Sequence, residues 1–269
     1  MVDTTTPDFR FAYHQGIRIA FRDHPGPDPA LVLVHGYRMH GGIWDDVIAA
    51  LGARHRAVAV DLRGNGASDR PSTGYDLPAL AGDVLAVIEA ARLDRPVLIG
   101  HSMGGTIVQY VMAERPEMLT AAVLVAPVPA SGVELPPEAV ETFRRSVHDK
   151  AVLRQLYEGS VAPGTAVVDR LMTLSATASP AAGEQSLDTW RRASFADRLA
   201  GCRVPTLVVA GAHDGLFSRD FLAATLLPRL ADARLTVVEA AGHFVPVEAP
   251  AALARLITDF VATVTGASA

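Results

Sequence analysis

Residues 96–105 read PVLIGHSMGG, and this stretch decides the fold. Its first half is a short apolar run typical of a buried strand, and an amphipathic helix pattern follows it directly. Residues 100–104, GHSMG, match the pattern G-x-S-x-G between the two. A strand-to-helix turn of this kind is so tight that the residues around the serine must be small, and it lifts the hydroxyl to the carboxyl end of a sheet. The stretch therefore predicts an exposed nucleophile, Ser102.

Apolar runs like the one before Ser102 recur along the chain and alternate with helical patterns. Runs that are apolar throughout are typical of strands buried on both faces, as in a parallel sheet. The strand-like runs are 30–35, 57–60, 97–99, 121–125, 206–210 and 235–238, and 9–13 with 17–21 form a predicted hairpin. The helical patterns are 76–93, 104–114, 218–230 and 249–264. This alternation predicts an α/β fold with a mostly parallel sheet and helices on both faces.

One region breaks the alternation, because residues 129–203 contain no convincing strand pattern. The region has short helical patterns of its own, separated by breaks rich in small residues. We interpret it as a helical insertion between two strands of the sheet. The predicted organisation is therefore a core from residues 1–128 and 204–269, with a helical cap from residues 129–203.

A serine hydroxyl is nearly inert at neutral pH, so a nucleophilic Ser102 needs a base. His243 follows the strand-like run 235–238, and Asp214 follows the run 206–210. The aspartate would hold the imidazole in the correct tautomer and stabilise it when it is protonated. Asp214 could instead serve only as a turn former before a glycine. The alternative position after the run 121–125 has no carboxylate before Glu134, so the predicted triad is Ser102, Asp214 and His243.

The predicted reaction needs donors for the negative oxygen that forms when the serine attacks. One donor is the backbone N–H of Met103, the residue after the nucleophile. The other is expected from the loop after the run 30–35, where Gly36 allows the backbone to come close. We therefore predict an oxyanion hole formed by the N–H groups of Met103 and Tyr37.

Five motifs in this order resemble the α/β-hydrolase superfamily from about residue 10 to 265: HGY at 35–37, DLRGNGASD at 61–69, GHSMGG at 100–105, AGAHD at 210–214 and GHFVPVEAP at 242–250. The chain looks most like the capped bacterial serine esterases. The resemblance implies a core of eight strands and a helical cap. Members with an aspartate nucleophile are excluded by Ser102. C–C bond hydrolases often carry asparagine, and cofactor-free perhydrolases often phenylalanine, where this chain has His101.

Several further residues are expected to contact the substrate. From the core these are Gly36, His101 and Phe244, and from the cap they are Phe143, Leu156, Tyr157, Met172 and Trp190. The cap residues could instead pack the cap onto the core. If some of them line the site, the bound group is apolar and of small to medium size.

Composition excludes several other functions for these 269 residues. A net charge of −5 argues against a nucleic-acid partner, which needs clustered positive charge. No apolar run reaches about 18 residues and no signal peptide is recognised, so we expect a cytoplasmic protein without membrane insertion. A single cysteine, Cys202, excludes a disulfide framework. We expect no metal and no cofactor, a small-molecule substrate as the partner, and a possible homodimer.

These inferences converge on a serine hydrolase that cleaves a carboxylic ester through an acyl-enzyme on Ser102. The same triad could serve a C–C bond hydrolase, a lactonase, a thioesterase or a cofactor-free perhydrolase of the haloperoxidase type. A non-catalytic ligand-binding protein on this fold is the remaining alternative.

Overall fold

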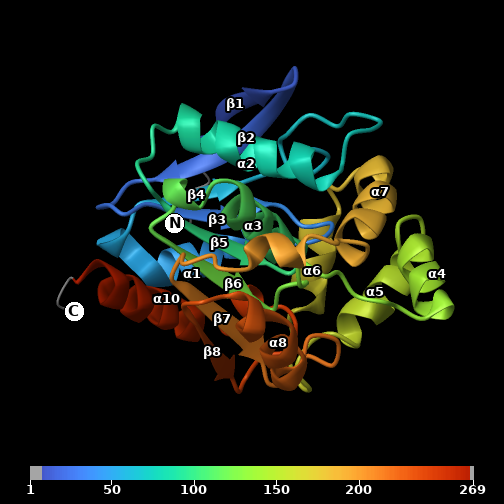
Figure 1. Ribbon diagram of the computed structural model, residues 1–269. Helices are drawn as coiled ribbons and strands as arrows, with labels where there is room; N and C mark the ends of the chain where they lie inside the picture. The colour runs from blue at the N-terminus through green and yellow to red at the C-terminus, as the bar shows by residue number, and fades with distance from the viewer. Residues whose placement is uncertain (1–7, 267–269) are drawn as a thin grey trace, which may run out of the picture.

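The computed structural model describes residues 8–266 and contains a mostly parallel eight-stranded sheet (Figure 1). The strands are β1 (Arg10–His14), β2 (Ile17–His24), β3 (Leu31–Val34), β4 (Ala57–Val60), β5 (Val97–His101), β6 (Ala121–Val125), β7 (Thr206–Gly211) and β8 (Ala233–Val238). Their order is β1-β2-β4-β3-β5-β6-β7-β8. Of these strands only β2 runs against its neighbours, as the second strand of the expected hairpin. The predicted fold class is confirmed.

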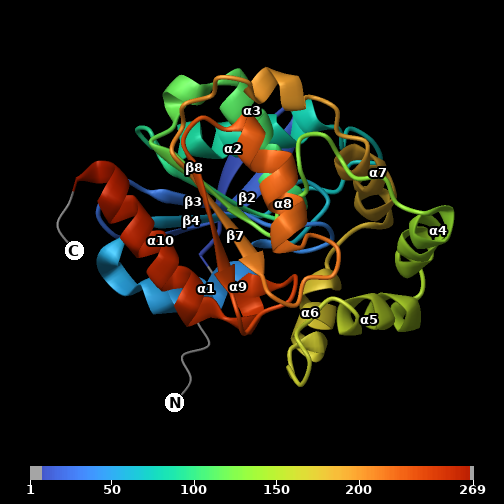
Figure 2. The ribbon, with the colours of Figure 1, turned by 60° about the horizontal axis from the view of Figure 1, so that its bottom comes forward.

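Every residue of β3 to β7 is buried, because helices cover both faces of the sheet. Helices α2 (Leu77–Ala90), α3 (Met103–Glu114) and α8 (Arg219–Leu226) lie on one face, and α1 (Asp45–Leu51) and α10 (Pro250–Thr265) lie on the other (Figure 2). Alternate residues of β6 enter the two resulting apolar cores. This double burial explains why the strands read as continuous apolar runs.

The predicted helices are present, with one notable difference in extent. The pattern at 218–230 forms α8 only to Leu226, and a 3-10 turn over Leu227–Arg229 follows. Pro228 lies within this turn. Proline has no N–H to donate to the preceding helical turn, so the α-helix cannot continue through it.

Residues between β6 and β7 form the expected helical insertion, which we call the cap. Its helices are α4 (Pro137–Ser146), α5 (Lys150–Glu158), α6 (Val168–Ser175), α7 (Pro180–Arg191) and a 3-10 turn over Ala196–Leu199. No strand occurs in this part of the described chain. Helices α4, α5 and α7 gather on one side of the molecule in both ribbon views (Figures 1 and 2). The division at residues 129 and 203 stays a prediction.

The loop at residues 61–69 is built from buried polar contacts. Asp61 accepts the backbone N–H groups of Gly41 at 2.7 Å and Ala67 at 2.8 Å. Arg63 pairs with Asp83 of α2 at 2.6 Å, and both side chains are buried. These contacts tie the loop to Gly41 and to α2.

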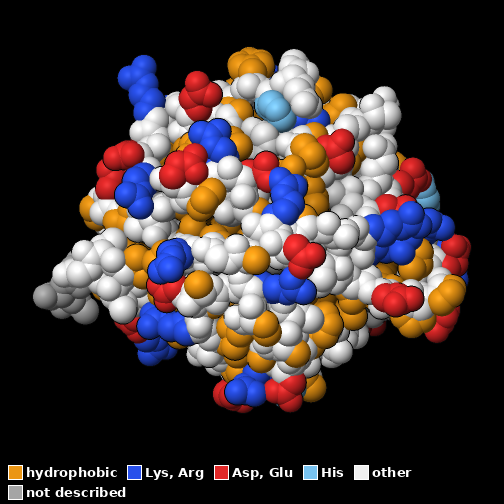
Figure 3. Space-filling model, viewed as in Figure 1, with side chains coloured by type: hydrophobic (Ala, Val, Ile, Leu, Met, Phe, Trp, Pro, Cys, Tyr) orange, Lys and Arg blue, Asp and Glu red, His pale blue; other side chains and the backbone are white. Residues whose placement is uncertain are grey.

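Charged side chains of both signs are interspersed over the face seen in Figure 3. Within residues 8–266 there is no helix with the length and apolar character needed to cross a membrane.

Candidate active site

Ser102 occupies a strained turn between β5 and α3. Its backbone has φ 54° and ψ −120°, in the left-handed half of conformational space that side chains rarely adopt. The glycines on either side leave no space for a side chain. A Cβ atom at Gly100 would lie 2.3 Å from the carbonyl oxygen of Gly104, and one at Gly104 would lie 2.4 Å from that of Val34. The GHSMG pattern is therefore required by close backbone packing.

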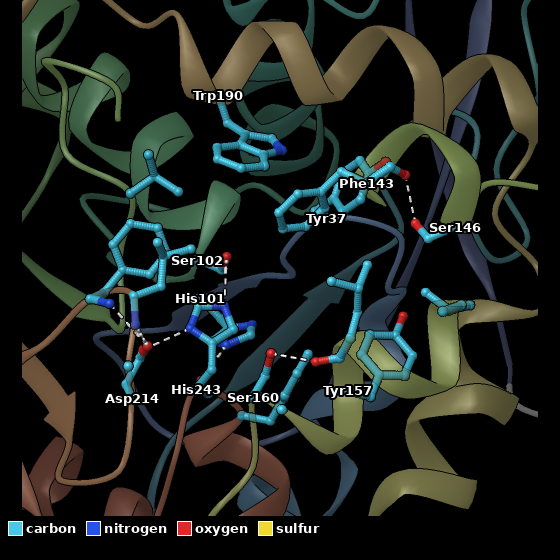
Figure 4. A pocket seen from close by; sticks show the side chains of 18 residues that line it. Tyr37, His101, Ser102, Phe143, Ser146, Tyr157, Ser160, Trp190, Asp214 and His243 are labelled. Atoms are coloured by element: carbon cyan, nitrogen blue, oxygen red, sulfur yellow. Dashed lines mark hydrogen bonds and ion pairs between the residues drawn. The ribbon is translucent and has the colours of Figure 1, made fainter. Parts of the chain in front are cut away.

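The structure brings the three predicted triad residues together from the ends of three strands (Figure 4). Ser102 Oγ lies 3.0 Å from His243 Nε2, and His243 Nδ1 lies 2.8 Å from Asp214 Oδ2. The second carboxylate oxygen of Asp214 accepts the backbone N–H groups of Leu216 and Phe217, each at 3.0 Å. This arrangement allows His243 to take the proton of Ser102 while Asp214 fixes the ring.

Asp214 is held in its charged form although its side chain is buried. Burial by itself raises the pKa of this carboxyl group. The neighbouring His243 ring and the N–H groups of Phe217 and Leu216 outweigh that effect, so the pKa of Asp214 lies below its usual range. A negative carboxylate is thus available at neutral pH to stabilise a protonated His243.

The two predicted oxyanion donors have free N–H groups. Within residues 8–266, neither the Tyr37 nor the Met103 N–H donates a hydrogen bond to another protein group. Gly36 lies directly behind the nucleophile, because a Cβ there would be 3.0 Å from Ser102 Cβ. Tyr37 directly follows Gly36 in the chain, and Gly36 contacts Ser102, so the backbone of Tyr37 is close to the nucleophile. The oxyanion hole formed by Met103 and Tyr37 stays a prediction.

His35 fixes the peptide unit that carries the Tyr37 N–H. Leu62 N–H donates to His35 Nε2 at 3.0 Å, so the ring proton must lie on Nδ1, which donates to the Gly36 carbonyl at 2.8 Å. Burial lowers the pKa of His35 to about 4, so the ring is neutral at pH 7. The Gly36 carbonyl and the Tyr37 N–H belong to one trans peptide and point in opposite directions. The bond from His35 therefore sets the direction of the Tyr37 N–H.

His101 contacts the triad through the backbone of His243. Its Nε2 lies 2.9 Å from the backbone carbonyl oxygen of His243. Burial lowers the pKa of His101 to about 3, so the ring is neutral at pH 7 and the Nε2 proton is donated to that carbonyl. Its Nδ1 atom has no partner among the described residues.

A cavity of about 270 Å³ lies above Ser102, between the core and the cap (Figure 4). Of the residues expected to contact substrate, the cavity wall contains His101, Phe143, Leu156, Tyr157, Trp190 and Phe244, together with Tyr37 and the triad. Met172 and Gly36 are not part of this wall. Met172 packs against the apolar core that includes side chains of α1 and α10. Gly36 is covered by Ser102.

The cavity wall also contains residues that the sequence analysis missed. These are Val128, Ser146, Leu153, Gly159, Ser160, Gly215, Leu216 and Phe217. The last three directly follow Asp214, so their place next to the triad could have been inferred from the chain. The residues from the cap have no such signal, since the packing of the cap helices determines which side chains face Ser102.

Among the described residues, Asp214 of the triad is the only carboxylate in the cavity wall. No arginine, lysine or glutamate belongs to it. Burying a charged ligand group without a partner is costly, so the wall favours a neutral ligand. Residues 8–266 also contain no group of three or more His, Cys, Asp or Glu side chains arranged to hold a metal ion.

The chain belongs to the alpha/beta hydrolase family, which matches residues 31–256. It is 31% identical to a non-heme chloroperoxidase of Streptomyces lividans, over 85% of this chain and 90% of that one. It is 27% identical to the 2-(acetamidomethylene)succinate hydrolase of Mesorhizobium japonicum, over 88% of this chain and 89% of that one. An esterase from Exiguobacterium antarcticum has the same fold, with a TM-score of 0.86 at 24% identity over 93% of this chain and 98% of that one. The class of enzyme is thus a hydrolase.

Proposed function

We propose that the protein is a serine hydrolase that cleaves a neutral carboxylic ester with a small to medium apolar group. The observation that carries this proposal is the 3.0 Å contact between Ser102 Oγ and His243 Nε2 in the wall of a cavity that contains no arginine, lysine or glutamate. A base in hydrogen-bonding reach of a hydroxyl, itself oriented by a carboxylate, is the arrangement that activates a serine.

In the first step Ser102 Oγ attacks the ester carbonyl carbon and His243 Nε2 takes the hydroxyl proton. The carbonyl oxygen becomes an oxyanion, which accepts hydrogen bonds from the N–H groups of Met103 and Tyr37. His243 then returns its proton to the alkoxy oxygen as the C–O bond breaks. The alcohol leaves, and the acyl group remains bonded to Ser102.

In the second step water takes the place of the alcohol. His243 Nε2 removes a proton from the water as its oxygen attacks the acyl carbon. The same N–H groups hold the new oxyanion, and His243 returns the proton to Ser102 Oγ as the acid leaves. The two steps balance with the ester and one water molecule as the reactants and the alcohol and the acid as the products.

The cavity volume limits the group that can be bound. A volume of about 270 Å³ lies at the lower end of the roughly 300–1,000 Å³ that is usual for small-molecule sites. We therefore expect esters of short and medium acyl chains to be preferred. The lack of an arginine or lysine in the wall argues against dicarboxylate substrates.

A second candidate is peracid formation, favoured by the likeness to the chloroperoxidase of Streptomyces lividans. Hydrogen peroxide would replace water in the second step, and the acyl group would leave as a peracid with one proton passing to Ser102 through His243. The chemistry before that step is unchanged. The two candidates therefore differ only in which nucleophile reaches the acyl-enzyme.

A panel of p-nitrophenyl esters from acetate to dodecanoate, assayed with the wild type and Ser102→Ala, tests the proposal. We expect turnover that peaks at a short or medium chain and is lost in the variant. A fluorophosphonate probe should label the wild type rapidly at Ser102. A wild type that is neither labelled nor active on esters, lactones or thioesters would overturn the proposal. Parallel assays with acetate and hydrogen peroxide measure peracid formation.

A further inference from the structure

The backbone of His243 is held on both sides by groups outside the triad. Its N–H donates to the carbonyl oxygen of Ser160 in the cap at 2.7 Å. Its carbonyl accepts the proton of His101 Nε2. Ser160 and His243 lie side by side in the cavity wall (Figure 4). The cap segment is thus bonded directly to the chain that carries the catalytic base.

Glu248, at the end of the short helix α9 (Val245–Glu248), holds the residues on each side of His243. One carboxylate oxygen, Oε1, accepts the N–H of Phe244 at 2.9 Å. The other, Oε2, accepts the N–H of Gly242 at 2.9 Å and also that of Ala162, from the cap, at 2.6 Å. Hydrogen bonds from N–H groups to a charged carboxylate are stronger than those between neutral groups.

The cap segment 160–162 packs closely against the loop that carries His243. A Cβ atom at Gly242 would lie 2.5 Å from the carbonyl oxygen of Ser160 and 2.8 Å from the nitrogen of Ala162. The contact therefore depends on glycine at 242 and on the carboxylate that receives N–H groups from both segments. Glu248 itself is absent from the cavity wall.

We propose that Glu248 is a positioning residue that fixes the His243 backbone and ties it to the cap segment 160–162. This inference rests on the proposed function, because it concerns how the same base is aimed at Ser102. The Nε2 atom must stay within hydrogen-bonding reach of Ser102 Oγ while Nδ1 keeps its bond to Asp214. A displacement of about 1 Å in such a geometry can lower the rate 10²-fold.

Two substitutions at Glu248 remove different numbers of its hydrogen bonds. Glu248→Gln keeps one oxygen but presents an NH₂ group where the other oxygen was, so at least one of the three N–H groups loses its acceptor. Glu248→Ala removes both oxygens. We expect kcat to fall about 10-fold in the first and about 10²-fold in the second, while KM changes less than about two-fold.

Two more variants separate positioning from stability. Asp76→Ala removes a carboxylate that accepts the Ala79 N–H at the start of α2 and does not belong to the cavity wall. It should lower the melting temperature and leave kcat unchanged. Gly242→Ala retains Glu248 but forces the cap segment away from the His243 loop. It should lower kcat like the Glu248 variants, and it serves as the test if Glu248→Ala does not fold.

The rate of fluorophosphonate labelling and the ester kcat per labelled serine are measured for every variant. Slower labelling and lower kcat at constant KM in folded Glu248→Gln and Gly242→Ala support the inference. Wild-type rates per labelled serine in these variants, even with a lower melting temperature, would overturn it and leave the proposed function standing. A wild type without labelling or ester turnover would instead remove the proposed function, and this inference with it.

Discussion

The cavity has a core wall, formed by residues of the α/β core, and a cap wall, formed by residues of the cap. In the core wall, hydrogen bonds hold Ser102, His243 and Asp214. In the cap wall, Phe143 and Trp190 are held by the packing of their rings. The triad atoms are linked at 3.0 and 2.8 Å. The Phe143 and Trp190 rings meet edge to face at 5.5 Å, and the Trp190 Nε1 atom has no partner among the described residues. Directional bonds tolerate little displacement, while apolar packing adapts to ligand shape. The difference indicates that chemistry depends on the core wall and selectivity on the cap wall.

The largest expected effect comes from removing the nucleophile or the base. Ser102→Ala and His243→Ala should each lower ester kcat by about 10³-fold or more, because each removes one partner of the 3.0 Å contact between Ser102 Oγ and His243 Nε2. Circular dichroism and melting curves should show a retained fold. Substantial turnover by either variant would contradict the assignment of chemistry to the core wall.

The acid should matter less than the nucleophile. Asp214→Asn keeps the shape but loses the charge that stabilises protonated His243, so we expect kcat to fall roughly 10²–10³-fold.

The same substitution should change the dependence of stability on pH. The pKa of Asp214 is lowered in the folded chain, so its ionised form contributes stability above the ordinary pKa of 3.8, and this is lost as the pH falls below that value. Urea unfolding between pH 3 and 6 should therefore show a smaller loss of stability in the variant than in the wild type.

A third prediction concerns the two neutral imidazoles buried in the core. The pKa values of His35 and His101 are lowered by burial to about 4 and about 3 from 6.5, so below pH 6.5 the unfolded chain binds protons that the folded chain does not. Stability should therefore fall with decreasing pH, by about 2 kcal/mol for each histidine between pH 7 and 5.

Urea unfolding at several pH values measures this slope. His101→Gln retains a donor for the His243 carbonyl but does not titrate, so it should flatten the slope by about half of the two-histidine contribution. An unchanged slope in that variant would show that other groups cause the acid sensitivity.

The smallest effect is expected in the cap wall. Phe143→Ala enlarges the cavity, so the preferred acyl chain should become longer, with kcat/KM for short esters reduced roughly 3–10-fold. Met172→Ala, in a cap residue outside the cavity wall, is the matched control and should leave chain-length preference unchanged. If Phe143→Ala lowered kcat as strongly as Asp214→Asn, the separation of chemistry from selectivity would be wrong.

The sheet and the triad could be predicted because local sequence rules determine both. Strands buried on two faces must be apolar throughout, and helices between them show a periodic apolar face. The tight turn at Ser102 demands small neighbours, so it leaves a readable pattern. Parallel strands bring their carboxyl ends to one edge of the sheet, so residues that follow these strands, such as Asp214 and His243, are expected near Ser102.

The cap wall and the support of His243 could not be predicted in the same way. Whether Met172 or Leu153 faces the cavity depends on the rotation of α6 and α5 against the core, which short amphipathic helices do not specify by sequence alone. The backbone N–H of Ala162 donates a hydrogen bond to the Glu248 carboxylate, 86 positions further along the chain. Nearly every residue has a backbone N–H, so the residue types do not indicate which N–H the Glu248 carboxylate accepts.

Strands β6 and β7 pair in register, Ala122 with Thr206 and Val125 with Val209, although the whole cap lies between them in the chain. The entropy of closing such a loop grows only with the logarithm of its length, about 0.6 kcal/mol for each doubling. The two strands therefore tolerate inserts of very different size at this junction. An exchanged insert could bring new substrates to the same triad, provided that it still offers a backbone carbonyl to the His243 N–H and an N–H to Glu248, as Ser160 and Ala162 do here.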